Sequence, residues 1–447
     1  MKPDWEAVRS ETLSTLQTIL RFDTTNPPGN ELPLAIYIER LLREEGIETS
    51  LLNTGKERAQ VIGRIRGSGA RRPVILLAHM DVVGVERAGW THDPFGGEIA
   101  GDYLYGRGAI DDKGMLAVNL VTMLQLQRSL RGTGGKLSRD VVFVATSDEE
   151  AGGEWGMGWL VKHHPEVLDA EFAINEGGRT RIIEGGRKYL AVQAAEKISH
   201  VVTVTARGSA GHAAIPLPDN AIFRLGIALE QLSRHVEPVL LTEITRQFFS
   251  RLAEIWPDRE EKNAMLDLVA GDEGQSQAGA RILSRRAVFN AVLRNGISPS
   301  VIQGGKQFNV IPDSASAVLN VRTLPGESID KVVARMRSAV TQPGIAIEIA
   351  ERGQESPWSD PGSEMFAAIS AAAHELDPKM PVVPYLSTGV TDSARLRRLG
   401  VQAYGLLPFP MLPADEERMH GADERIPLDA LHFGSRLVFG AISRIAR

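Results

Sequence analysis

Residues 141–153 read VVFVATSDEEAGG, and this stretch decides the kind of fold that the chain can adopt. It opens with a near-continuous apolar run and ends at three consecutive acids, Asp148, Glu149 and Glu150. Apolar runs of this length are typical of strands that are covered on both faces, as in the parallel sheet of an α/β protein. The stretch therefore predicts a buried strand with crowded carboxylates at its end.

Helix and strand patterns alternate around this stretch. Before and after it, amphipathic helices separate further apolar strands, with helices expected at 5–22, 31–46, 113–130 and 156–168 and strands at 59–67, 73–83, 140–147 and 171–178. This order is typical of an α/β domain with a mostly parallel central sheet. The same pattern returns from about 355 and closes with a helix at 428–445.

The pattern changes between residues 196 and 352. Strand-like 197–208, helical 220–236 and the alternating stretch 307–326 indicate a smaller α+β unit, and 241–290 is helical, polar and without chemical motifs. A chain of 447 residues is long enough for two domains. We therefore predict an α/β fold with a split larger domain, 1–195 and 353–447, and a smaller inserted domain at 196–352.

Composition excludes several classes of function. The net charge is -6 and no basic run occurs, which argues against nucleic acid and anionic membranes as partners. The chain has no cysteine, so disulfides, a thiol nucleophile and thiolate metal sites are excluded. No secretory apolar segment or run of roughly 18 apolar residues is found, and we expect a cytoplasmic protein.

Polar residues follow the predicted strands where an open α/β sheet places its sites. His79 and Asp81 follow the strand of 73–83 and point to one side of it, so His79 fits a metal ligand that Asp81 orients. A capped strand end would explain the same pair. Asp111 and Asp112 precede a helix in GRGAIDDKG, where helix capping explains one aspartate better than two.

The acids of the opening stretch form a third cluster. Glu149 and Glu150 would face opposite sides of a strand, so they can share a site only if the chain turns, and Ala151-Gly152-Gly153 supplies the turn. Two adjacent carboxylates raise one another's pKa unless a cation offsets the repulsion. A solvated acidic loop is the alternative. Glu176 ends the next strand in INEGG.

Two histidines outside the helical patterns could complete such a site. His212 lies in the turn GSAGHAAIP of the inserted domain, and His420 lies in the polar loop RMHGADERIP before the last helix. Taken singly, each is more often structural than functional.

The ordered set AHMDVV, GRGAIDDKG, TSDEEAGG, INEGG, GSAGHAAIP, FNVIP and HGADE resembles the di-zinc amidohydrolases and exopeptidases. That family includes aminoacylase, carboxypeptidase G, carboxypeptidase S, acetylornithine deacetylase and succinyl-diaminopimelate desuccinylase. The resemblance implies two zinc ions per subunit, with Co²⁺ or Mn²⁺ as substitutes. It assigns His79 and Glu176 to one ion, Glu150 and His420 to the other, and Asp111 to both.

The same resemblance implies roles for the remaining residues. Glu149 would be the general base that takes a proton from the bridging water and returns it to the leaving nitrogen. The inserted domain would be a lid and dimerisation domain. The segment 241–290 would either lengthen the lid or form a dimer contact. His212 would polarise the scissile carbonyl in the neighbouring subunit. Asn309 and Arg322 would hold the substrate carboxylate, with a salt bridge as the alternative for Arg322.

The sequence thus predicts a zinc hydrolase that cleaves an amide beside a free carboxylate, in N-acyl amino acids or small peptides. WTHDPFGG and INEGG are most similar to carboxypeptidase S and related N-acyl amino acid hydrolases, and the loop 387–394 resembles a substrate-site loop. The alternatives are a biosynthetic deacetylase or desuccinylase and a non-catalytic metal-binding homologue. A nucleotide-dependent oxidoreductase is excluded because GRGAIDDKG lacks the G-x-G-x-x-G pattern.

Overall fold

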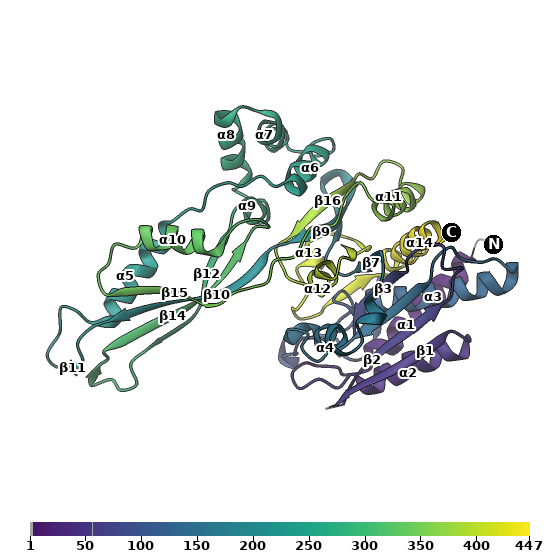
Figure 1. The fold of residues 1–447 in the computed structure, drawn as a ribbon, viewed down its shortest axis with the longest axis horizontal. Helices are drawn as coiled ribbons and strands as arrows, with labels where there is room; N and C mark the ends of the chain where they lie inside the picture. Colours follow the sequence, from purple (N-terminus) through teal and green to yellow (C-terminus); the bar gives the residue numbers. More distant parts are fainter. Residues whose placement is uncertain (1–2, 56) are drawn as a thin grey trace.

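A ten-stranded sheet forms the centre of the larger part of the molecule in the computed structural model, which describes residues 3–55 and 57–447 (Figure 1). Its order is β1-β2-β6-β3-β7-β17-β9-β8-β18, and β16 pairs with β9. The pairs from β6 through β3 and β7 to β17 are parallel, whereas β1–β2, β2–β6, β9–β17 and β8–β9 are antiparallel. The predicted α/β class with a mostly parallel central sheet is confirmed. The strands are Glu48–Gly55 (β1), Arg58–Ile65 (β2), Val74–His79 (β3), Val141–Thr146 (β6), Phe172–Asn175 (β7), Arg179–Ile182 (β8), Lys188–Glu196 (β9), Val382–Ser387 (β16), Gln402–Gly405 (β17) and Pro410–Met411 (β18).

Helices cover both faces of this sheet because its strands are apolar on both sides. In β3, Leu76 and Ala78 pack in one cluster with the first group of helices, while Ile75 and Leu77 pack in a second cluster with the other group. The first group is Trp5–Leu20 (α1), Leu32–Glu44 (α2), Lys113–Thr133 (α3), Glu364–Leu376 (α11) and Leu428–Ile445 (α14). The second is Met157–His163 (α4) and Ser393–Arg398 (α12). A short helix, Pro413–Glu416 (α13), follows β18.

A separate four-stranded antiparallel sheet, ordered β12-β14-β10-β15, lies beside the large sheet (Figure 1). Along β14, every second residue from Ala315 to Val321 is buried against two helices, α5 and α10, which cover one face. These elements are Ile198–Arg207 (β10), Gly296–Gly304 (β12), Ser314–Thr323 (β14), Ile345–Glu351 (β15), Ala221–Arg234 (α5) and Ile329–Ala339 (α10). At the outer end of this sheet, Gly211–His212 (β11) pairs with Val310–Ile311 (β13).

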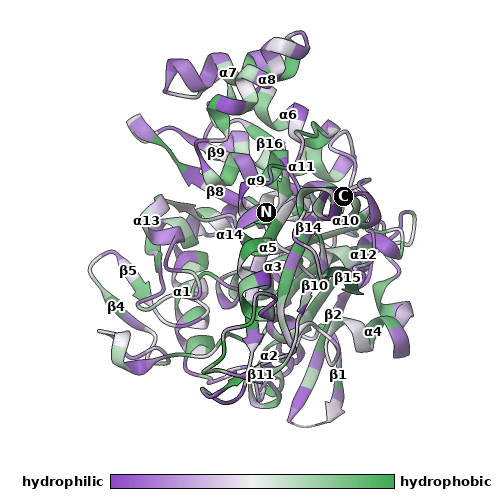
Figure 2. Cartoon of the chain, turned by 90° about the vertical axis from the view of Figure 1, so that its left-hand side faces the viewer, coloured by the Kyte–Doolittle hydropathy of each residue, from purple (hydrophilic) through white to green (hydrophobic). Residues whose placement is uncertain are grey.

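The helical segment expected at 241–290 forms four helices, Glu243–Leu252 (α6), Arg259–Ala270 (α7), Glu273–Leu283 (α8) and Ala287–Leu293 (α9). Figure 2 shows hydrophilic and hydrophobic stretches alternating along α7 and α8, as in amphipathic helices. Their apolar residues form one core with the large sheet, in which Phe248 and Phe249 of α6 pack with Tyr189 of β9 and Leu386 of β16. The segment is therefore anchored on the ten-stranded sheet rather than on the smaller one.

A third small sheet brings together two distant parts of the chain. Arg425–Pro427 (β19) pairs with Tyr103–Tyr105 (β5), which pairs with Glu98–Ala100 (β4). The loop before α3 is thereby placed beside the loop before α14.

The chain passes from the ten-stranded to the four-stranded sheet at residue 197, between β9 and β10, returns to the ten-stranded sheet with α6 to α9, and leaves the four-stranded sheet after β15. We keep 1–195 with 353–447, and 196–352, as the proposed domain division. Among the described residues, none of the helices has the length and apolar character that a membrane crossing needs.

Candidate metal centre and active site

His79 is the last residue of β3, and its ring is almost fully buried. Its Nε2 lies 3.0 Å from Asp111 Oδ1, and its Nδ1 lies 3.0 Å from the backbone oxygen of Asp81. The carboxylate of Asp81 is farther away, at 3.5 Å from Nδ1. The ring is therefore oriented through its Nδ1, chiefly by the backbone of residue 81, while Nε2 faces the cluster of acids.

The Asp81 carboxylate holds the two glutamates by their backbones. Its Oδ1 accepts the N–H of Glu149 at 3.1 Å, and its Oδ2 accepts the N–H of Glu150 at 3.1 Å and the side-chain amide of Asn26 at 2.8 Å. Burial acts to raise the pKa of Asp81. Hydrogen bonds from His79 and Asn26, together with the charge of His79, nevertheless hold this pKa below its ordinary value. Asp81 thus remains an acceptor that fixes the start of the turn carrying both glutamates.

The chain turns at Asp148, earlier than the turn expected at 151–153. Asp148 has a φ of +68°, and a short 3-10 helix, Glu149–Ala151 (η2), follows before Gly152 (φ +103°) and Gly153 (φ +71°). A left-handed backbone is unfavourable for aspartate, so it needs support from its surroundings. Asn26 and the backbone N–H of Trp155 donate to the Asp148 carboxylate at 3.1 and 2.9 Å, and Arg58 forms a buried ion pair with it.

Asp111 lies between two imidazoles at the start of α3. Its Oδ1 is 3.0 Å from His79 Nε2 and its Oδ2 is 3.2 Å from His420 Nε2. His420 Nε2 also lies 3.3 Å from Glu150 Oε1. Hydrogen bonds to Asp111 first and Glu150 second raise the pKa of His420 to about 10. One carboxylate therefore faces two histidines that are 341 positions apart in sequence, which is 420 minus 79.

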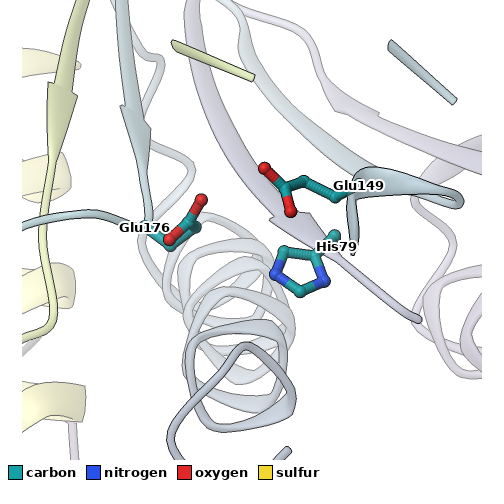
Figure 3. A group of neighbouring side chains, drawn as sticks. All are labelled: His79, Glu149 and Glu176. Atoms are coloured by element: carbon teal, nitrogen blue, oxygen red, sulfur yellow. The ribbon is translucent and has the colours of Figure 1, made fainter. Parts of the chain in front are cut away.

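Two groups of side chains among residues 3–55 and 57–447 could hold cations. In the first, ligand atoms of His79, Glu149 and Glu176 all lie within 4.8 Å of one another, and Figure 3 shows the three side chains around a common space. In the second, those of His79, Asp111 and Glu150 do the same.

The electrostatics of the cluster fit a metal. Burial, then the charge of Asp111, raises the pKa of Glu176 to about 8, and burial raises that of Glu149 well above its ordinary value. Crowded, buried carboxylates with raised pKa values are stabilised by a cation. The donors are imidazole nitrogens and carboxylate oxygens, a set that zinc, cobalt and manganese accept. These residues therefore fit a pair of divalent cations.

A cleft of about 1140 Å³ opens beside Glu149, and α4 and α12 line it together with the start of β10, the end of β15 and the segment that follows β15. Trp155 and Trp159 lie on one side and Ser199 of β10 lies on the other. The loop 387–394 also lines it, through Val390, Thr391 and Ala394, next to Arg395. The structure thus places the loop that resembles a substrate-site loop in the wall of a cavity that reaches Glu149.

Three predicted site residues lie outside the cluster. His212 and Asn309 lie together at the outer tip of the four-stranded sheet, where the Ala213 N–H donates to the Asn309 backbone oxygen at 3.0 Å. Figure 1 shows this tip at the end of the molecule remote from β3. Arg322 lies in β14 near the junction of the two sheets, where its Nε donates to Asn320 Oδ1 at 2.9 Å and its buried Nη1 has no hydrogen-bond partner among the described residues.

The residues that support the cluster were not predicted from the sequence. Asn26, in a loop, and Arg58, the first residue of β2, hold Asp81 and Asp148 from segments that carried no motif. Arg107 and Glu424 lie inside two quoted motifs, GRGAIDDKG and HGADE, and their opposite charges in those two motifs are the signal that could have identified them as a pair. Asp112, fully buried, accepts the N–H of His79 at 3.3 Å.

Comparison with protein families finds one matching model, described as "Peptidase family M20/M25/M40", over residues 75–444. Curated relatives include "Probable carboxypeptidase S-like 2" of Dictyostelium discoideum, which is 27% identical over 80% of this chain and 68% of its own length. They also include "N-fatty-acyl-amino acid synthase/hydrolase PM20D1" of Xenopus tropicalis, 26% identical over 80% of this chain and 70% of its own length.

Solved structures share the fold over nearly the whole chain. An M20 family metallo-carboxypeptidase of Sulfolobus solfataricus superposes with a TM-score of 0.71 at 19% identity, covering 98% of this chain and 99% of its own. A protein of Bacillus subtilis described as a dinuclear metal binding peptidase of the M20 family gives 0.61 at 17% identity, covering 99% and 100%.

Proposed function

This chain belongs to the peptidase family M20/M25/M40, and on that premise we propose that it is a dinuclear zinc hydrolase that cleaves an amide beside a free carboxylate. Its substrates would be N-acyl amino acids or small peptides. The observation that carries the proposal is the position of Asp111, one oxygen of which faces His79 at 3.0 Å and the other His420 at 3.2 Å. A carboxylate with two different histidine neighbours is placed to serve two cations at once.

The cluster divides into ligands and one remaining carboxylate. Two bound cations would supply Lewis-acid polarisation of water and of the substrate carbonyl. The residues that would hold them are His79 and Glu176 on one side, Glu150 and His420 on the other, and Asp111 between. Glu149 is then the general base, because its side chain faces the same space and also borders the cleft.

Asp81 prepares Glu149 and Glu150 for these separate tasks. By accepting both backbone N–H groups it fixes the turn from which one side chain would reach a cation and the other would move a proton. The proton taken from water by Glu149 would pass to the leaving nitrogen when the amide bond breaks.

The substrate's carbonyl and carboxylate would be bound by the smaller domain. His212 and Asn309 lie too far from the cluster within one chain to act there, so we propose that they act in the site of a second copy. Arg322, with a buried and unpartnered Nη1 near the cleft, would bind the substrate carboxylate.

A homodimer through the smaller sheet accounts for its exposed edge. β12 is an edge strand, and Ile302 on it is 65% exposed, while Phe223 on the adjacent α5 is 74% exposed. An unpaired strand edge beside exposed apolar side chains is a surface that a second copy can cover. Pairing there would also bring the tip with His212 to a partner.

We expect the cleft to accept bulky acyl groups. It has room for a long or aromatic acyl chain, and Trp155 and Trp159 offer such a chain apolar surface among the charged residues that also line the cleft. A deacetylase or desuccinylase of amino acid biosynthesis, the alternative, would need contacts that reject such chains.

The test is amide hydrolysis by protein stripped of metal and reloaded with zinc. The panel would contain amino acids with long, aromatic, acetyl and succinyl acyl groups, dipeptides, and the same compounds with the carboxylate amidated. We expect activity to return with zinc, to favour bulky acyl groups and to require the free carboxylate. Glu149→Gln should lower kcat by about 10²–10⁴-fold and keep both zinc ions.

Two outcomes would contradict the proposal. If the reloaded protein binds two zinc ions but hydrolyses none of the amides, the proposed hydrolase activity is wrong. Loss of zinc together with activity in Glu149→Gln would show that Glu149 is a ligand and not the base.

A further inference from the structure

A buried ion pair, Arg107 with Glu424, lies directly behind the Asp111 and His420 side of the cluster. Glu424 is fully buried and Arg107 is 2% exposed. Arg107 Nη1 donates to Glu424 Oε2 at 2.6 Å. Neither residue faces the cleft, so neither is placed to touch a substrate.

Each member of the pair binds the backbone of a loop that carries a site residue. Glu424 accepts the N–H groups of Gly108 at 3.0 Å, Ile110 at 2.8 Å and Asp111 at 3.1 Å. Arg107, from its Nη2, donates to the backbone oxygens of His420 at 3.1 Å and Gly421 at 3.0 Å. The loop before α3 and the loop before α14 are therefore joined through one pair of charges.

The backbone at His420 needs this support. Its φ is +62°, a conformation that is uncommon for residues other than glycine. Asp423, with a φ of +51°, anchors the outer side of the same loop by accepting the N–H and hydroxyl of Thr91, each at 2.8 Å. Arg107 anchors the inner side, at the carbonyl of His420 itself.

The two sides of the cluster are held by different means. His79 and Glu176 directly end or follow the neighbouring parallel strands β3 and β7, so the sheet sets their separation. Asp111 and His420 lie in loops, and their separation depends on contacts between those loops. The ion pair of Arg107 and Glu424 lies behind these two loops and contacts the backbone of both Asp111 and His420.

We propose that Arg107 and Glu424 are positioning residues: their ion pair sets the distance between Asp111 and His420 and thereby the affinity for the cation on the Glu150 and His420 side. This inference rests on the proposed dinuclear site. Because Asp111 would serve both cations, we expect some effect at each position and the larger effect on the Glu150 and His420 side, where Arg107 holds the His420 backbone.

The test is a titration of metal-free protein with Co²⁺, followed by visible absorption and calorimetry, in wild type and in Arg107→Lys. Lysine keeps the charge but cannot donate to Glu424 and to two carbonyls in the fork that arginine provides. We expect two binding steps in wild type. In the variant, one step should weaken by about 10–100-fold and the other, which shares Asp111, clearly less. His420→Ala identifies the step that belongs to the weakened side.

Arg139→Lys is the matched control. Arg139 is also fully buried, and it donates to Glu171 at 2.8 Å and to the backbone oxygen of Arg72 at 3.1 Å, at the opposite ends of the same strands. It should leave both cobalt steps unchanged. Glu424→Gln is the second variant, measured in case Arg107→Lys does not fold, and it should weaken the same step most.

The outcomes separate this inference from the proposed function. Wild type that binds fewer than two Co²⁺ would overturn the dinuclear site and this inference with it. Wild type that binds two, with both steps unchanged or both weakened equally in the variants, would overturn the positioning role alone. The same would follow if Arg139→Lys weakened the step that Arg107→Lys weakens.

Discussion

The cluster of candidate metal ligands and the tip of the smaller sheet both carry motifs of the family resemblance. Within a single chain, only the residues of the cluster are held in place by buried contacts. At the cluster, Asp81 accepts the backbone N–H groups of Glu149 and Glu150, and further buried groups hold Asp81 and Asp148 in turn. At the tip, His212 belongs to a two-residue strand that pairs with the equally short β13, and Phe308 nearby is 99% exposed. The cluster is preassembled, while the tip lacks a surface to pack against.

This difference follows from what each region can bury. Hydrogen bonds and ion pairs at the cluster are formed in a shielded interior, where leaving one partner unmade is costly. A two-stranded ribbon of such short strands has little apolar contact of its own and is only marginally stable alone. A site divided in this way is completed only when a second surface meets the tip.

The largest effect is expected when one region is changed on one chain and the other region on a second chain. Glu149→Gln removes the proposed base and His212→Ala the proposed carbonyl contact, so each homodimer should lose at least about 10²-fold in kcat. If His212 acts in its partner's site, a mixed dimer contains one site with both substitutions and one with neither. Random mixing should then restore activity to about a quarter of the wild-type value.

The control is the double variant, Glu149→Gln with His212→Ala on one chain, mixed with wild type. Its mixed dimers contain no intact site, so the activity per wild-type chain should fall. Should the two single variants stay inactive after verified subunit exchange, His212 would act within its own chain or not at all.

The cluster could be read from the sequence to the extent that its residues follow strands. His79, Glu149, Glu150 and Glu176 come at or just after the carboxyl ends of apolar runs, and such ends meet at one edge of a parallel sheet. His420 follows no strand, and only the ordered family resemblance identified it. His212 was likewise identified by the family resemblance alone. Its position far from the cluster could not be predicted from the residues around it in the sequence.

The supporting residues could not be predicted because their partners are distant in sequence. Arg58 meets Asp148 across 90 positions, and neither residue lies in a motif that implies the other. The early turn at Asp148 depends on that contact, so local turn chemistry pointed to the glycines instead. For the same reason the packing of the helices at 241–290 on the large sheet, through burial of α6 against β9 and β16, could not be predicted, and their role in a lid or at a dimer contact stays a prediction.

The buried network beside the cluster should contribute to the pH dependence of the free energy of unfolding. Glu31 is fully buried with its Oε1 3.7 Å from Arg58, and burial, followed by the charge of Asp81, raises its pKa to about 7 from 4.5. Between these two values the folded chain keeps a proton that the unfolded chain has released. Stability should therefore fall as pH rises from about 4.5 to 7, by at most roughly 3 kcal/mol from this group.

Glu31→Gln should remove that part of the pH dependence. The measurement is the free energy of urea unfolding of metal-free protein at several pH values, in the variant and in Glu348→Gln, which changes an exposed residue of β15. Only Glu31→Gln should flatten the slope between pH 5 and 7. Parallel curves for wild type and Glu31→Gln would mean that Glu31 is ionised in the folded chain across this range.

The smallest effect is expected at the tip, and it would show whether a partner covers it. Phe308→Ala removes a side chain that is 99% exposed in the single chain, so the free energy of unfolding should change by less than about 0.5 kcal/mol in dilute protein. Phe143→Ala, at a fully buried position of β6, should cost about 3–5 kcal/mol in the same assay. If Phe308→Ala instead costs more than about 1 kcal/mol, and more so as protein concentration rises, the tip is packed against a second copy. The contrast between the two regions would then describe the isolated chain and not the assembled enzyme.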